Sequence, residues 1–92
     1  MSTPTVAAII KKQIGIWPLA EVGARGFMFD SRSLYFDAKP KSRIVRVVVT
    51  LDPSDTYTVR VLNKRTGEAL YVRESVYAAD LASLVRDLPK NV

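Results

Sequence analysis

Residues 43–63 read RIVRVVVTLDPSDTYTVRVLN and contain two β-rich segments on either side of a turn. Both segments, 43–51 and 57–62, consist almost entirely of Val, Ile, Leu, Thr, Tyr and Arg. Such runs, bounded by Asp, Pro and Ser, are typical of strands. Between them, Asp52-Pro53 suits a type I turn, because the carboxylate can accept a local backbone hydrogen bond while proline presets φ. The stretch therefore predicts an antiparallel hairpin that the rest of the chain has to cover.

The two faces of this hairpin differ in character, because successive strand side chains point to opposite sides. One face is almost purely apolar and consists of Val45, Val47, Val49, Leu51, Tyr57, Val59 and Val61. The other face mixes arginine and threonine with apolar residues and consists of Ile44, Arg46, Val48, Thr50, Thr56, Thr58, Arg60 and Leu62. An antiparallel sheet with one packed and one solvated face has this pattern.

Amphipathic segments flank the strands. Near the N-terminus a helix is expected to begin at Thr3-Pro4 and end at Gly15, with an apolar stripe made of Val6, Ile9, Ile10 and Ile14. Near the C-terminus a helix capped by Ser75 and ended by Pro89 is expected, with a stripe made of Tyr77, Leu81, Leu84, Val85 and Leu88. We expect both stripes to pack on the apolar sheet face.

The remaining segments complete the fold prediction. A short helical turn from Pro18 to Gly23 precedes a first hairpin over 27–37, and a glycine-containing loop at 63–67 leads into a strand over 69–73. Trp17 is expected to pack in or near the core, with a binding role as the alternative. The order of elements predicts a single α+β domain over residues 1–92, in which an N-terminal and a C-terminal helix cover one face of an antiparallel sheet of about four to five strands.

Composition excludes several classes of chemistry. The chain has neither cysteine nor histidine, so thiolate catalysis, zinc–thiolate sites, imidazole ligation and a histidine general base are all absent. The nine carboxylates are scattered, and Asp30, Asp37, Asp52 and Asp55 fall at strand ends, where turn chemistry explains them. We therefore expect no catalytic residue, no metal and no cofactor.

Location and general partners follow from hydropathy and charge. No apolar run approaches the roughly 20 residues of a membrane span, and the N-terminus lacks the pattern of a secretory signal. A cytoplasmic protein without membrane contact is expected. The net charge of +5 favours polyanions or acidic proteins as partners.

Basic residues concentrate around the central hairpin and form the candidate phosphate-binding or partner-binding site. They are Lys39, Lys41, Arg43, Arg46, Arg60, Lys64, Arg65 and Arg73. Guanidinium groups on a sheet face, with Tyr35 and Tyr71 as stacking partners if they face outward, can hold a phosphate backbone or single-stranded bases. The alternative is a solvated face whose arginines cover apolar neighbours and pair with acids such as Asp55 or Glu74.

The segment Gly23-Ala24-Arg25-Gly26 invites comparison with a phosphate-binding loop. It leads into a strand, however, whereas such loops run from a strand into a helix. A helix stop followed by a tight turn is the expected role.

Several motifs resemble a family of small, mostly uncharacterised proteins encoded by phages and prophages. They are Ile10-Lys11-Lys12-Gln13-Ile14-Gly15, Gly23-Ala24-Arg25-Gly26-Phe27, the Val-rich strand into Leu51-Asp52-Pro53-Ser54-Asp55-Thr56-Tyr57, and Val76-Tyr77-Ala78-Ala79-Asp80-Leu81. Val22 and Gly26 stand where many members have Thr and Asn. The resemblance covers about Ile9 to Leu88 and implies a fold and a phage origin but no active site.

In size and charge the chain also resembles, more weakly, phage anti-CRISPR proteins that act on the type I-F surveillance complex. This resemblance implies a non-enzymatic inhibitor that binds a host protein–RNA complex, including CRISPR surveillance subunits and guide RNA, in the host cytoplasm and blocks target DNA binding through a basic surface. The alternative is a phage nucleic-acid-binding accessory protein in replication, recombination or regulation. A structural or assembly protein is a third hypothesis. Trp17 and Arg25 are additional candidates for the contact surface.

Overall fold

The computed structural model describes residues 6–39 and 43–88, and within them five strands form a single antiparallel sheet. The strands are β1 (Arg25–Phe29), β2 (Ser33–Ala38), β3 (Val45–Leu51), β4 (Tyr57–Asn63) and β5 (Ala69–Val76). Their spatial order is β1-β2-β3-β4-β5, so each strand pairs with its neighbour in sequence. The predicted α+β class is confirmed.

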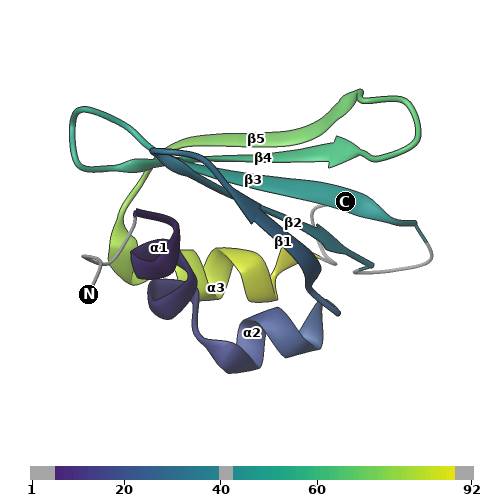
Figure 1. The fold of residues 1–92 in the computed structure, drawn as a ribbon, viewed down its shortest axis with the longest axis horizontal. Coiled ribbons are helices and arrows are strands. Elements are labelled where there is room, and N and C mark those ends of the chain that lie inside the picture. The colour runs from purple at the N-terminus through teal and green to yellow at the C-terminus, as the bar shows by residue number, and fades with distance from the viewer. Residues whose placement is uncertain (1–5, 40–42, 89–92) are drawn as a thin grey trace.

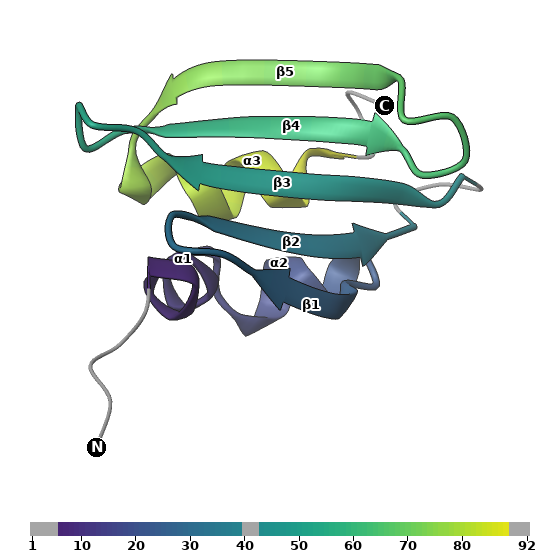
Figure 2. The same ribbon diagram turned by 45° about the horizontal axis from the view of Figure 1, so that its top comes forward.

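The helices lie on one side of this sheet (Figure 1). They are α1 (Val6–Ile14), α2 (Ile16–Glu21), the 3-10 turn η1 (Ala78–Asp80) and α3 (Leu81–Arg86). Turning the molecule brings the other side of the sheet forward, and no described helix crosses it (Figure 2). The predicted helix start at Thr3-Pro4 and helix stop at Pro89 lie outside the described residues.

The core forms between the helices and the apolar sheet face that the alternation predicts. Val47, Val49, Val59 and Val61 are fully buried. They share one apolar cluster with residues of the two predicted helical stripes, namely Ile10, Ile14, Leu81, Val85 and Leu88. Removal of this apolar surface from water is the main stabilising term of such a small domain.

The turn between β3 and β4 is closed by backbone hydrogen bonds, and it also contains a residue in the left-handed conformation. The amide of Asp55 donates to the carbonyl of Asp52 at 3.0 Å, and the amide of Asp52 donates to the carbonyl of Thr56 at 2.8 Å. Asp55 itself has a left-handed φ of 65°, a conformation that Asp tolerates better than most residues. This closes the hairpin so that Leu51 pairs with Tyr57.

Three apolar residues predicted to pack inward are exposed instead. Ile9 is 44% exposed, because α1 packs into the core cluster through Ile10 and Ile14. Tyr77 is 66% exposed, because its backbone is still extended (φ −79°, ψ 152°) and so does not share the helical periodicity. Trp17 is 77% exposed, because α2 packs through Pro18 and Leu19.

The start of the last helical segment also differs from the prediction. Ser75 belongs to β5, which runs to Val76 rather than ending at Arg73, and has a left-handed φ of 55°. It lies where the β4–β5 register shifts, between the pairs Tyr57–Val76 and Val59–Arg73. No side-chain cap hydrogen bond forms at the start of η1 or α3. The predicted Ser75 cap is therefore wrong.

Candidate functional site

The sheet face opposite the helices, called here the open face, carries two of the predicted arginines. Arg46 pairs with Asp37 of β2 and Leu62 of β4, while Arg60 pairs with Val48 of β3 and Val72 of β5. Their strand neighbours Val45, Val47, Val59 and Val61 are buried on the helix side, so the two arginines point away from the helices. Arg60 is exposed and Arg46 half-buried.

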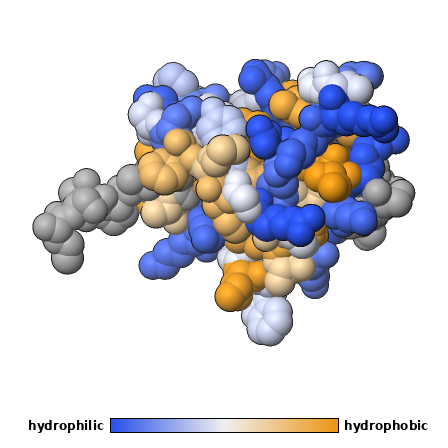
Figure 3. Space-filling model, turned by 45° about the vertical axis from the view of Figure 1, so that its right-hand side comes forward, coloured by the Kyte–Doolittle hydropathy of each residue, from blue (hydrophilic) through white to orange (hydrophobic). Residues whose placement is uncertain are grey.

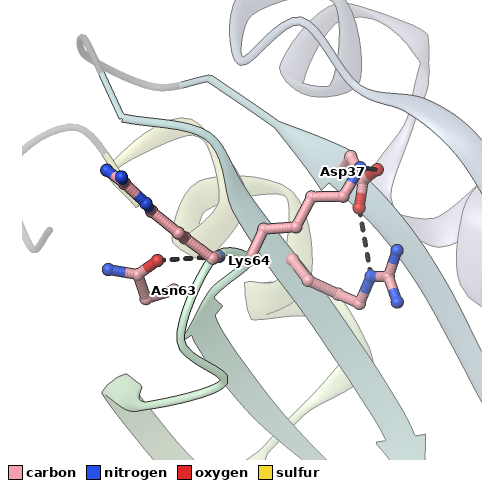
Figure 4. A network of polar contacts seen from close by, with 5 residues as sticks. Asp37, Asn63 and Lys64 are labelled. Atoms are coloured by element: carbon pink, nitrogen blue, oxygen red, sulfur yellow. Dashed lines mark hydrogen bonds and ion pairs between the residues drawn. The ribbon is translucent and has the colours of Figure 1, made fainter.

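Asp37 is the centre of a charged network on this face. Its carboxylate accepts a hydrogen bond from Arg46 Nε at 3.1 Å through Oδ1 and from Lys64 Nζ at 2.5 Å through Oδ2, as Figure 4 shows. Burial alone would raise the pKa of Asp37, but the hydrogen bonds and charges of Lys64 and Arg46 outweigh it, so this pKa is lowered. Asp37 is therefore ionised and holds both cations in place at neutral pH.

The loop after β4 is shaped by Asn63. Its side-chain oxygen accepts a hydrogen bond from the amide of Arg65 at 2.9 Å, and the amide of Gly67, with a φ of 77°, donates to the carbonyl of Asn63 at 2.7 Å. An Asx turn followed by a left-handed glycine holds a short loop in one shape. The loop therefore carries Lys64 and Arg65 at the end of the sheet.

Most of the remaining predicted cations gather at the same end. Ala38, Val45 and Asn63 pair across β2, β3 and β4, which brings together the residues that follow β2, precede β3 and follow β4. We call this cluster the basic end; it consists of Lys39, Arg43, Arg46, Lys64 and Arg65, together with Arg60, which lies on the same open face at the middle of β4. Figure 3 turns this end of the molecule forward and shows hydrophilic side chains gathered around a few hydrophobic ones.

Two predicted residues do not join the basic end. Arg73 pairs with Val59, which is buried on the helix side, so Arg73 projects toward α3 rather than onto the open face. There it lines a hollow of about 230 Å³ together with Ser75, Asp80 and Ser83, among others. Lys41 lies outside the described residues.

The charges at the basic end are only partly compensated. Arg46 and Lys64 both form ion pairs with the one carboxylate of Asp37. Among the described residues, Arg43, Arg60 and the guanidinium of Arg65 form no ion pair. The basic end thus presents a net positive surface with one internal carboxylate.

Of the two tyrosines proposed for stacking, Tyr35 lies on the open face. It pairs with Val48, in a cross-strand row with Arg60, and its hydroxyl donates a hydrogen bond of 2.5 Å to Asp30. This bond raises the pKa of Tyr35 and lowers that of Asp30. Tyr71 pairs with buried Val61 and packs against the core, so it is unavailable for stacking on this face.

The Gly23-Ala24-Arg25-Gly26 segment has the expected structural role. Gly23 (φ 66°) ends α2, where its amide donates to the carbonyl of Ala20 at 3.1 Å, and Gly26 (φ 67°) lies in β1 at a register irregularity. Arg25 pairs with Asp37 at the first position of β1 and is exposed. The segment leads into a strand and does not form a phosphate loop.

Sequence reasoning missed the role of Asp37, which it assigned to a strand end. The available signal was the alternation of side chains along each strand. Asp37 lies on the same face of β2 as Tyr35, and Arg46 lies on the same face of β3 as Val48. Only the pairing register between β2 and β3 brings Asp37 opposite Arg46. The sequence alone does not fix this register, because β2 and β3 are joined by six residues rather than by a tight turn of defined geometry.

The described residues contain no group of three acids that could hold a metal ion. In that same part of the chain, no helix is long and apolar enough to cross a membrane. Comparisons with protein-family models, with curated proteins and with solved structures give no match to this chain. The structural argument for a function therefore rests on the site itself.

Proposed function

We propose that this chain is a non-enzymatic binding protein that contacts the phosphate backbone of a ribonucleoprotein through its basic end. In its most specific form, the protein is a phage-encoded inhibitor that occupies a type I CRISPR surveillance complex in the host cytoplasm and blocks target DNA. The observation that carries the proposal is the set of guanidinium groups that form no ion pair with a described residue, Arg43, Arg60 and Arg65, beside the oriented pair Arg46 and Lys64. The phage origin rests on the family resemblance, and the CRISPR target rests on the weaker resemblance in size and charge to anti-CRISPR proteins.

Guanidinium chemistry supports a phosphate partner. Arg forms planar, bidentate hydrogen bonds that match phosphate oxygens. Because Asp37 already restrains Arg46 and Lys64, less side-chain entropy is lost when these groups meet a ligand. A rigid sheet face can then hold a stretch of backbone while the helix layer behind it obstructs the path of DNA.

A second candidate function is that of a phage accessory protein that binds single-stranded nucleic acid. The cross-strand row of Tyr35, Val48 and Arg60 favours it. Single-strand binders combine an aromatic side chain, on which a base stacks, with cations that follow the backbone. This function uses the same face with a different partner.

The test is a competition assay with a purified type I-F surveillance complex and its labelled target DNA. The parent protein should abolish DNA binding near a fixed molar ratio, without metal and without turnover. Replacement of Lys41, Arg43, Arg46 and Arg60 by Ala should weaken inhibition at least about tenfold. Arg43 and Arg60 are exposed and contribute little to stability, and loss of the half-buried Arg46–Asp37 ion pair should lower the melting temperature only slightly, so the variant should stay folded. Arg73→Ala is the matched control, because Arg73 faces the helix side.

Other outcomes separate the two functions. Direct binding of single-stranded RNA or DNA, with a log–log salt slope that falls by about one for each contact removed, would favour the accessory protein. Turnover of a substrate at substoichiometric protein would show an enzyme. A quadruple variant that inhibits as the parent does would exclude the basic end as the contact surface.

A further inference from the structure

The helix layer carries a second exposed feature, at the junction of α1 and α2. Ile16 and Trp17, the first two residues of α2, are 75% and 77% exposed, more than any other large hydrophobic residue among those described. In Figure 1, α2 is the part of the helix layer that lies farthest from the sheet. Exposed Trp beside a second large apolar side chain is typical of interaction surfaces.

The local sequence explains why these side chains face outward. Gly15 alone separates the two helices, and its φ of 90° turns the chain sharply between them. Pro18 and Leu19 then pack inward as the buried residues of α2. In a helix of six residues, the side chains opposite this pair are covered by no other element among the described residues, so Ile16 and Trp17 remain exposed.

Beside Ile16 lies a hollow with apolar walls and a positive rim. It has a volume of about 420 Å³ and is lined by Ala8, Lys11, Lys12, Gly15, Ile16 and Leu19. No acid is among these residues. The nearest acid along α2, Glu21, has Arg86 within 4.0 Å. The electrostatic potential in the hollow is therefore dominated by the positive charges of Lys11 and Lys12.

Lys11 also ties the hollow to the edge of the sheet. Its ammonium lies 4.1 Å from the centroid of the Phe27 ring on β1, a cation–π contact. The Phe27 ring in turn lies 5.6 Å, centroid to centroid, from buried Phe36. Lys11 is thus held beside the hollow, whereas Lys12 is exposed and makes no ion pair with a described residue.

We propose that this α1–α2 hollow binds an acidic amphipathic segment of a partner protein. One large apolar side chain of that segment enters the hollow against Ile16, and flanking carboxylates meet Lys11 and Lys12. The segment continues over Trp17, which follows Ile16 in α2 but does not line the hollow. Charge complementarity selects this occupant over a second copy of the chain, because a copy with a net charge of +5 is repelled by the two lysines. The hollow lies in the helix layer and the basic end on the open face, so both surfaces can be occupied at once.

Trp17 is the only tryptophan of the chain and serves as the reporter. The probes are two short synthetic peptides of Leu, Phe and Glu, one with helical spacing and one with strict alternation of apolar and acidic residues. Saturable binding of either peptide should shift Trp17 emission to the blue as the indole leaves water. Matched peptides with Lys in place of Glu, or Ser in place of Leu and Phe, should produce no shift.

Variants distinguish this surface from the basic end, which also attracts acidic peptides. Lys12→Glu should weaken binding by about tenfold or more, as measured by both Trp17 emission and the anisotropy of labelled peptide. Arg60→Glu, the matched charge reversal on the open face, should leave the Trp17 shift unchanged. Trp17→Ala should reduce affinity in the anisotropy assay, and because the side chain is exposed this variant should keep the parent melting temperature.

Two results would overturn the proposal. One is the absence of a saturable Trp17 shift with either acidic peptide, including the case where anisotropy rises and Arg60→Glu abolishes the rise. The other is a blue shift that grows with protein concentration in the absence of peptide, together with a dimer in sedimentation equilibrium, which would identify a second copy as the occupant. Neither result bears on the phosphate-binding function of the basic end, so the two proposals fail separately.

Discussion

Lys64 reaches across β3 to bind Asp37: its ammonium, in the loop after β4, donates a hydrogen bond of 2.5 Å to a carboxylate 27 positions earlier, at the end of β2. Arg46 of the intervening strand holds the other oxygen of the same carboxylate. Three successive strands are thereby joined on the open face by side chains, in addition to their backbone ladders. The bridge also determines how much positive charge the basic end presents.

Asp37→Asn should change stability and binding in opposite directions. The loss of two partly exposed ion pairs should lower the free energy of unfolding at neutral pH by about 1 kcal/mol. The same change gives up the restraint on Arg46 and Lys64 but also removes a negative charge beside them. Because we expect the charge effect to exceed the lost preorganisation, affinity for a polyanion should rise. Urea unfolding and competition binding measure the two effects, and Glu68→Gln, an exposed charge loss in the neighbouring loop, is the control.

The stability difference should depend on pH in a stated direction. The pKa of Asp37 is lowered from its ordinary value of 3.8, so the unfolded chain binds this proton more tightly than the folded one. The stabilisation by Asp37 is therefore present above about pH 4 and is lost as the pH falls through the folded-state pKa. Parent and Asp37→Asn should converge in stability in acid, and a difference that persists there would show that the ion pairs are not its cause.

Adjacent isoleucines on α1 provide a matched test of the packing. Ile10 is fully buried and Ile9 is 44% exposed. Ile10→Asp should unfold the domain, because an unpaired charge in the core costs several kcal/mol against a typical stability of about 5–15 kcal/mol. Ile9→Asp should lower the melting temperature only slightly. Equal effects in thermal unfolding followed by circular dichroism would contradict the assigned face of α1.

Ser75 offers a stabilising substitution. Its φ of 55° is unfavourable for a residue with a side chain, so Ser75→Gly should raise the free energy of unfolding by about 0.5–1 kcal/mol, net of the greater entropy of glycine in the unfolded chain. Ser54→Gly is the control, since among the described non-glycine residues only Asp55 and Ser75 have positive φ. A loss of stability in Ser75→Gly would mean that the hydroxyl makes a needed contact.

The sequence predicts the sheet better than it predicts the helix surface. Period-two alternation identifies Val47 and Val59 as core residues without knowledge of any other element, and burial of both confirms it. Helical periodicity selects Ile10 and Ile14 correctly but does not exclude Ile9, because the width of a helix's buried face depends on what packs against it. The width of the buried face of α1 is therefore set by its tertiary contacts and not by its own sequence.

The candidate site is only partly predictable for a similar reason. Composition and spacing place cations near the central hairpin, yet Arg60 and Arg73 look equivalent until the β4–β5 register assigns them to opposite faces. At each register irregularity between β4 and β5, β5 has one more residue than β4. Neither a turn motif nor residue spacing in the sequence predicts these extra residues. Trp17 is expected from the sequence to lie in or near the core but is exposed. Its exposure depends on which side of the six-residue helix α2 packs against the rest of the protein, and the sequence of α2 alone does not determine that side.

The sequential strand order also has a consequence for folding during synthesis, because the sheet can form before its apolar face is fully covered. Every strand pairs with the one made just before it, so the whole sheet can assemble hairpin by hairpin with short-range contacts, which favours rapid formation. Its apolar face, however, is completed by Leu81 and Val85 of α3, which also contacts α1 and α2 from the other end of the chain. A nascent chain in which α3 has not yet emerged from the ribosome would therefore carry five paired strands with an incompletely covered valine surface, and the emergence of α3 is the step that completes this cover.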